Sequence, residues 1–283
     1  MFVLNVIGKG AAPKMFSELA TGAPAILSPD FAFDLPVADA GALAAARDLA
    51  RGAGLDINLV KTANRKKKLL AADMDSTIIT VECMDELAEI AGLGPVIADT
   101  TARAMRGELD FQTAMLERIG LLKGIPLSVL EQTYSERVRL NPGAKSLLAT
   151  MRAHGAHTML VSGGFDFFTQ RVAEAAGFHV HHGNTLLDDG VALTGDVKRP
   201  IQGGDTKREL LEDAATALGI KIEDTLAVGD GANDRAMVRR AGLGVAYHAK
   251  PILVETADAI IAHNDLTALL YLQGYKDSEI SRA

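Results

Sequence analysis

The stretch Leu69-Leu70-Ala71-Ala72-Asp73-Met74-Asp75-Ser76-Thr77 decides how the rest of the chain is interpreted. Its first four residues are all apolar, which is typical of a strand covered on both faces of a parallel sheet. Two carboxylates, Asp73 and Asp75, follow the strand directly. Ligands bind beyond the carboxyl ends of strands in open α/β sheets, so we expect this strand end to form part of a site. Because two acids this close repel each other, we also expect a cation beside them, most simply a metal ion.

Composition and charge narrow the class of protein. The chain has 283 residues, of which 48% are hydrophobic and 23% charged, as in an ordinary globular protein with a core. A net charge of -7 argues against a generic nucleic-acid surface. The single cysteine, Cys83, excludes an internal disulfide and fits a reducing compartment. The start has no signal-peptide pattern and no apolar run is long enough to span a membrane, so we expect a cytoplasmic protein.

The first part of the chain predicts a small α/β region over residues 1–62. Strand-like segments at 2–7 and 56–60 flank an alanine-rich helical segment at 38–51. The basic run at 65–68 is expected to be a solvated linker, and we place a domain boundary there.

The main domain is expected to cover residues 68–283. No strong strand pattern is found over about 80–142, so this segment is expected to be a helical cap inserted after the first strand, where it can act as a lid. Beyond it, strands alternate with helices, which indicates an α/β fold with a mostly parallel sheet. We expect residues 162–164 to open a helix, and strands at 179–184 and 191–197 to pair as a hairpin.

Polar side chains that suit phosphoryl transfer recur at the strand ends of this domain. In chain order the strand-end groups are Asp73, Asp75, Ser162, Asp230, Asn233 and Asp234, and Lys207 opens the helix before the last of these strand ends. A carboxylate can act as a nucleophile, and a second one can protonate the leaving oxygen and then activate water. Mg²⁺ prefers oxygen ligands such as these carboxylates. A hydroxyl, a main-chain N–H and a lysine ammonium can hold the remaining phosphoryl oxygens.

Taken singly, each of these features has a simpler interpretation. The acidic stretch would also fit a turn in which Ser76 or Thr77 caps a helix, and Ser162 with its two glycines would fit a cap and a tight turn. Lys207 would fit the exposed face of an amphipathic helix. Their common order at successive strand ends is what favours a site.

The segments 73–77 and 229–234, with Ser162 and Lys207, resemble the four motifs of the haloacid-dehalogenase-like phosphohydrolases. The resemblance covers about residue 68 to the C-terminus, helical cap included. It implies a Rossmann-like core with Asp73 as nucleophile and Asp75 as general acid/base. A dehalogenase would need neither the second aspartate nor a metal, so that branch is disfavoured.

The same resemblance implies a ligand set. Mg²⁺ would be held by Asp73, by Asp230 and by the main chain of Met74 or Asp75, with the Asp75 side chain near the metal. Phosphate-binding and supporting roles would fall to Ser162, Gly163, Lys207, Asn233 and Asp234, the last of these behind the metal rather than on it.

The cap carries a second resemblance, to the phosphoserine phosphatase family. It implies that Glu82 faces the ammonium of the substrate, that Arg118 pairs with its carboxylate, and that Met105 and Phe111 line an apolar wall. The chemistry fits an amino-acid zwitterion, since a carboxylate recognises an amine and a guanidinium grips a carboxylate bidentately. Taken alone, Glu82 would fit a first-turn glutamate and Arg118 an exposed helix arginine.

These patterns, with the two resemblances, imply Mg²⁺-dependent hydrolysis of O-phosphoserine to serine and phosphate through an aspartyl-phosphate, the last step of serine biosynthesis. One alternative is a related small-molecule phosphatase, or a phosphotransferase with another acceptor such as homoserine. Another is a non-catalytic phospho-ligand sensor, which would need neither Asp75 nor the full set of metal ligands. Residues 1–62 fit either a compact amino-acid-binding region of the ACT type or a packing appendage, and a homodimer stays open.

Overall fold

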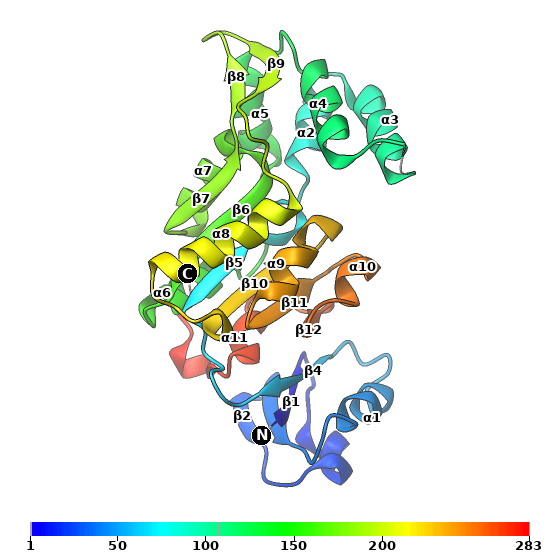
Figure 1. Cartoon of the computed structure of the whole chain (residues 1–283). Helices are drawn as coiled ribbons and strands as arrows, with labels where there is room; N and C mark the ends of the chain where they lie inside the picture. The colour runs from blue at the N-terminus through cyan, green and yellow to red at the C-terminus, as the bar shows by residue number, and fades with distance from the viewer. Residues whose placement is uncertain (1, 107, 283) are drawn as a thin grey trace.

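The computed structural model describes residues 2–106 and 108–282, apart from the side chains at 104, 105 and 111. Parallel strands form the main sheet in the order β12-β11-β10-β5-β6-β7 (Figure 1). Their bounds are β5 (Leu69–Ala72), β6 (His157–Phe165), β7 (Val180–Asn184), β10 (Thr225–Gly229), β11 (Leu243–Tyr247) and β12 (Ala259–Ile261). Because β5 lies between β10 and β6, the acidic stretch that follows it is central at the carboxyl edge of the sheet.

Helices cover both faces of the main sheet, which confirms the predicted α/β fold (Figure 1). Side chains alternate along a strand, so Leu69 and Ala71 of β5 pack on one face and Leu70 and Ala72 on the other. The first face is covered by α8 (Gly204–Ala217), α9 (Arg235–Arg240) and α10 (Pro251–Val254). The second is covered by α6 (Ala144–Ala153), α7 (Asp166–Ala176) and α11 (Ala268–Leu272). None of the helices in the described ranges combines the length and apolar character needed to cross a membrane.

A helical cap follows β5 and precedes β6, as the sequence predicts. Its helices are α2 (Cys83–Ile90), α3 (Gly94–Met105), α4 (Phe111–Leu121) and α5 (Leu127–Arg137). The hairpin of β8 (Leu186–Asp188) and β9 (Leu193–Val197) extends from the core to the cap. There the Leu193 carbonyl accepts from the Gly124 N–H at 2.8 Å, and the Leu193 N–H donates to Ile125 at 2.9 Å. The α4–α5 end of the cap is therefore fixed to the core.

Two local predictions are wrong. The hairpin turn is where we expect it, but its first strand is β8, because the residues of β7 form their ladder with β6 in the main sheet. The Ser162-Gly163-Gly164 segment does not open a helix. It lies within β6, whose register shifts between Val161 and Phe165, and α7 begins at Asp166.

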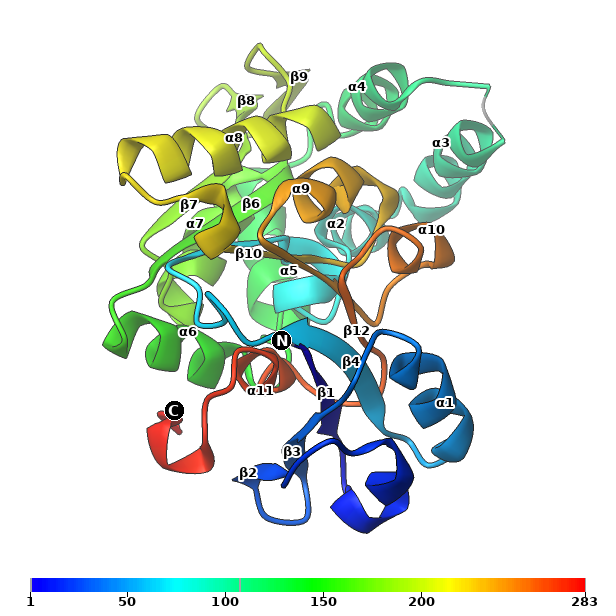
Figure 2. The ribbon, with the colours of Figure 1, turned by 60° about the horizontal axis from the view of Figure 1, so that its bottom comes forward.

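The N-terminal residues form a separate antiparallel sheet in the order β2-β3-β1-β4. Its strands are β1 (Phe2–Ile7), β2 (Ala25–Ser28), β3 (Ala32–Pro36) and β4 (Asp56–Lys61). One face packs on α1 (Ala42–Leu49) and on the short helical segment η1 (Pro13–Leu19). The other face joins the core that contains α11, which lies between the two sheets (Figure 2). The sequence predicts β1, β4 and the helix but misses β2 and β3.

Polar contacts lock the small sheet to the main domain. The side chain of Asn58 on β4 donates to the Ile260 carbonyl at 2.9 Å and accepts from the Ile260 N–H at 2.8 Å, as a further strand would. Arg65, in the connection to β5, forms an ion pair with Asp34 and donates to the Leu272 carbonyl at 2.8 Å. The two parts thus share a core and these contacts, and the domain boundary placed at residues 65–68 stays a prediction.

Candidate active site

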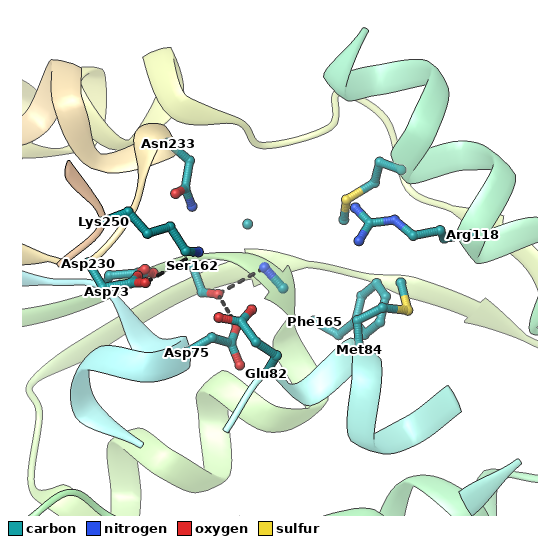
Figure 3. Close-up of a pocket in the computed structure, with 13 residues that line it drawn as sticks. Asp73, Asp75, Glu82, Met84, Arg118, Ser162, Phe165, Asp230, Asn233 and Lys250 are labelled. Carbon is teal, nitrogen blue, oxygen red and sulfur yellow. Dashed lines mark hydrogen bonds and ion pairs between the residues drawn. The ribbon is translucent and has the colours of Figure 1, made fainter. Parts of the chain in front are cut away.

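The acidic stretch leaves β5 as a tight turn rather than a helix. Asp73 is almost fully buried and its carboxylate accepts from the Met74 N–H at 2.8 Å. The turn η2 (Met74–Ile78) then reverses the chain, with Ser76 in the left-handed region at a φ of 54°. The turn leaves the carboxylates of Asp73 and Asp75 lining one pocket (Figure 3).

Lys207 is the buried cation of the site. It comes from the first turns of α8, and its ammonium donates to Asp73 at 2.6 Å and to Asp234 at 2.7 Å. Burial acts to lower the pKa of Lys207, but the carboxylates of Asp234 and Asp73 outweigh it and raise that pKa. The lysine is therefore charged and lies with the acids, as the sequence predicts for this position.

Asp234 supports the site from behind. Its second carboxylate oxygen accepts from the N–H groups of Asp230 at 3.2 Å and Gly231 at 3.0 Å, so both of its oxygens are occupied. Gly229 at the end of β10 allows this close approach, because a Cβ there would lie 2.3 Å from the Asp234 Cγ. These bonds hold the loop that follows β10, including Asp230, in place.

Three carboxylates are grouped closely enough to hold a cation. One oxygen each from Asp73, Asp230 and Asp234 lies within 4.8 Å of the others. Since Asp234 is committed to Lys207 and to main-chain donors, the free oxygens belong to Asp73 and Asp230. Burial and the nearby Asp234 raise the pKa of Asp73, although the ammonium of Lys207 opposes them. Hard carboxylate oxygens fit Mg²⁺.

Asp75 lies outside this acidic group and has different partners. Its carboxylate accepts from the Cys83 N–H at 2.9 Å and from the Ser162 hydroxyl at 3.4 Å. Burial and the charge of Glu82 raise the pKa of Asp75 to about 6, although the bond from Cys83 opposes them. A carboxyl group that titrates near neutral pH can both donate and accept a proton. Burial raises the pKa of the Cys83 thiol, so Cys83 is not a reactive thiolate.

Ser162 and Gly163 lie at the carboxyl end of β6, beside Asp75. The Ser162 hydroxyl is buried and accepts from the Gly164 N–H at 2.8 Å. The Gly163 carbonyl accepts from the side chain of Asn184 at 2.8 Å, which fixes the peptide that follows. This strand end presents a hydroxyl and glycine main chain to the pocket, which suits oxyanion binding.

Glu82 and Arg118 approach the pocket from the cap. Glu82 precedes α2 and accepts from the Ser76 hydroxyl at 2.8 Å. Arg118 on α4 lies across the pocket from Asp73 (Figure 3), and its Nε donates only to the Ala114 carbonyl, at 3.3 Å. Among the described residues no carboxylate lies within 4.0 Å of the Arg118 guanidinium. Burial lowers the pKa of Arg118, against the opposing charges of Asp85 and Glu82.

These side chains meet in one pocket of about 130 Å³. Its lining contains Asp73, Asp75, Glu82, Arg118, Ser162, Gly163, Asp230 and Asn233 from the predicted set, while Lys207 and Asp234 lie buried beneath it. Ligand pockets for drug-sized molecules measure roughly 300–1,000 Å³, so this one suits a small substrate. The predicted wall residues Met105 and Phe111 have side chains outside the described residues.

The sequence misses four residues of the pocket. Its apolar wall within the described residues is built from Met84, Met115 and Phe165, and Lys250 lines the opposite side (Figure 3). A signal for Lys250 was present, because it follows β11 at the same sheet edge as the other strand-end groups. The methionines lie on cap helices, and no strand-end rule applies to them.

Comparisons with known proteins agree with this geometry. A model of the haloacid dehalogenase-like hydrolase family matches residues 70–239. Over 247 residues the chain is 43% identical to a phosphoserine phosphatase of Archaeoglobus fulgidus, covering 86% of this chain and 72% of that protein.

Two solved structures are similar to the chain over different lengths. A haloacid dehalogenase family hydrolase from Salmonella enterica serovar Typhi has a TM-score of 0.87 and 31% identity, covering 96% of this chain and 98% of its own. A phosphoserine phosphatase solved as a phospho-aspartyl intermediate analogue has a TM-score of 0.67 and 40% identity. This match covers 72% of this chain and 98% of the other. The first similarity extends into the N-terminal sheet, since so little of the chain is left uncovered.

Proposed function

The chain belongs to the haloacid dehalogenase-like hydrolase family, and we propose that it is a Mg²⁺-dependent phosphatase that hydrolyses O-phosphoserine to serine and phosphate. Its relatives are phosphoserine phosphatases, which supports the reaction class. The assignment of the substrate rests mainly on the position of Arg118. It lies opposite Asp73 in the same pocket and has no ion-pair partner among the described residues.

The two ends of the pocket suit the two ends of phosphoserine. At one end, Asp73, Ser162 and the buried Lys207 provide a nucleophile and groups that bind phosphoryl oxygens. At the other, Glu82 offers a carboxylate to the substrate ammonium, and Arg118 a guanidinium to its carboxylate. Binding both ends positions the phosphorus against Asp73, which accounts for catalysis by orientation.

The first step transfers the phosphoryl group to the enzyme. A carboxylate oxygen of Asp73 attacks phosphorus, and the bond from phosphorus to the serine oxygen breaks. Asp75 gives its proton to that leaving oxygen, which its raised pKa of about 6 allows. Lys207 contacts Asp73 at 2.6 Å and offsets negative charge where the phosphoryl group arrives.

The second step regenerates the enzyme. Asp75, now ionised, takes a proton from a water molecule whose oxygen attacks the phosphorus of the aspartyl-phosphate. The bond from phosphorus to the Asp73 oxygen breaks, and inorganic phosphate and the Asp73 carboxylate result. The Asp75 carboxyl group thus acts first as an acid and then as a base. Because the product is free serine, this reaction would be the last one of a route that produces serine.

Asp73 and Asp230 would hold Mg²⁺ through their free oxygens, together with main-chain oxygen from Met74 or Asp75. Bound there, the metal would supply positive charge that lets a phosphate dianion enter an acidic pocket. Asp234 holds Asp230 through its N–H and is joined to Asp73 through the ammonium of Lys207.

The test is phosphate release from a panel of monoesters, each with Mg²⁺ and with EDTA. We expect phosphoserine to be preferred many-fold over phosphothreonine, sugar phosphates and nucleotides, and only with metal. Broad metal-dependent activity would keep the core chemistry but remove the roles of Glu82 and Arg118. Adding homoserine distinguishes transfer from hydrolysis, because phosphohomoserine would form as phosphate release falls. No activity on any ester would favour a sensor.

A further inference from the structure

Lys250 lines the active-site pocket and has no part in the chemistry described above. Its ammonium lies 3.5 Å from one carboxylate oxygen of Asp230 (Figure 3). Among the described side chains it is the one cation within ion-pair distance of Asp230. The Asp230 side chain is only 10% exposed, whereas that of Lys250 is 66% exposed. The contact therefore joins a nearly buried carboxylate to a lysine whose end reaches solvent.

The main chain of Lys250 is held by hydrogen bonds, while its side chain is largely exposed. Its N–H donates to the Asp230 carbonyl at 2.8 Å, and its own carbonyl accepts from Leu253 at 3.0 Å at the start of α10. Two residues earlier, His248 adopts a left-handed φ of 43°, and its N–H donates to Ile261 at 2.8 Å. These contacts anchor the root of the side chain beside Asp230, and its flexible stem lets the ammonium leave the carboxylate at little cost.

The carboxylate of Asp230 is also one of the two with oxygens available to a divalent cation. Asp73 already accepts from Lys207 and Met74, and Asp234 is fully committed, so Asp230 is the ligand whose surroundings most affect a metal. An ammonium beside it lowers the local negative potential and repels a second cation. Lys250 and a metal ion would thus both interact with the negative charge of the Asp230 carboxylate.

We propose that Lys250 is a positioning residue that competes with the metal for Asp230 and so weakens the binding of Mg²⁺. This inference rests on the proposed function only for the identity of the metal. Metal uptake requires the ammonium of Lys250 to withdraw from Asp230, and metal release is assisted by its return. The lysine sets the affinity of the site without touching the phosphorus.

The experiment measures Mg²⁺ binding directly, by calorimetric titration of full-length protein that has been stripped with EDTA and dialysed. Lys250→Met removes the charge and keeps the length of the stem. We expect it to bind Mg²⁺ about fivefold more tightly than wild type, the upper end for a solvent-exposed ion pair. Lys250→Arg keeps the charge and should restore the wild-type affinity. At high salt the difference between Lys250→Met and wild type should shrink, because the ammonium is screened.

Arg235→Met is the matched control. It removes the same charge from neighbouring α9, but Arg235 donates to Thr256 and has no contact with Asp230. Its Mg²⁺ affinity should stay within about twofold of wild type. An equal gain in Arg235→Met and Lys250→Met would reduce the effect to net charge and overturn the proposal.

The other outcomes are equally decisive. Unchanged or weaker Mg²⁺ binding by Lys250→Met would overturn the competition. Unchanged Mg²⁺ binding with weaker inhibition by inorganic phosphate would make Lys250 a phosphate ligand instead. Wild-type protein that takes up no Mg²⁺ would remove this inference together with the metal part of the proposed function. Tight Mg²⁺ binding without phosphoserine hydrolysis would overturn the substrate and leave the competition intact.

Discussion

Replacing Arg118 by alanine tests the amino-acid end of the pocket. Arg118 is partly buried, and within the described residues no carboxylate pairs with it, so a substrate carboxylate would be its ion partner. Hydrogen bonds to charged groups contribute about 1.5–3 kcal/mol each, and truncating one partner of a buried charged pair costs about 2–5 kcal/mol. Taking about 3 kcal/mol, kcat/KM for phosphoserine should fall roughly 150-fold.

The assay compares phosphoserine with p-nitrophenyl phosphate, which uses the same phosphate end but has no amino-acid carboxylate. Arg118→Ala should change kcat/KM for p-nitrophenyl phosphate by less than about threefold, since no transition-state contact to that ester is lost. Arg118→Lys keeps the charge but loses the bidentate fork, so its loss should be intermediate.

Arg137→Ala is the matched control, because Arg137 lies on cap helix α5, pairs with Glu86 at 3.7 Å and does not line the pocket. It should leave both activities near wild type. Equal losses on the two esters in Arg118→Ala would refute the reasoning, and would mean that Arg118 supports the cap rather than the substrate.

Three further predictions address the chemistry and the fold. Asp73→Asn should abolish turnover and leave no acid-stable radiolabelled phosphoenzyme; substantial residual activity would remove the nucleophile assignment. Because the pKa of Asp75 is raised to about 6, its acid form prevails below pH 6 and its base form above. Phosphoenzyme trapped by rapid quench should therefore accumulate at pH 5 and diminish at pH 7.5. A phosphoenzyme level that does not change with pH would contradict the assignment of Asp75. Arg65→Ala should lower the free energy of unfolding by about 3–5 kcal/mol, because it leaves the buried Asp34 carboxylate without its ion partner. Arg51→Ala, which removes an exposed ion pair, should change the free energy of unfolding by less than about 1 kcal/mol. Denaturant titration measures both values.

The grouping of the residues at the proposed phosphate end was predictable because the topology of a parallel sheet places every strand end at one edge. Asp73 and Asp230 directly follow β5 and β10, and Ser162 lies near the carboxyl end of β6, and these strands are neighbours in the sheet. Lys207 follows from charge, since clustered carboxylates require a cation. The strand-end rule also applies to Lys250, which follows β11 and was not predicted.

The residues that the cap contributes to the pocket, at the proposed amino-acid end, were less predictable. Helix periodicity in the cap identifies the apolar face of a helix but not whether that face lies toward the pocket. Met84 and Met115 read as ordinary core residues of α2 and α4, yet both line the pocket. The small N-terminal sheet was half predicted for a similar reason. The edge strand β2 and its neighbour β3 are short, with four and five residues, and Leu27 and Ala32 are buried in the core that contains α11, which is far away in sequence.

The shared core decides how amino-acid binding by the N-terminal region, residues 1–62, has to be tested. An isolated fragment of residues 1–62 would expose the face of the sheet that packs toward α11, and it would lose the contacts of Asn58 and Arg65. Failure of such a fragment to bind serine would therefore reflect unfolding as much as the lack of a site. Serine binding has to be measured on the full chain, where competition with phosphoserine separates binding in the active-site pocket from binding at the small sheet.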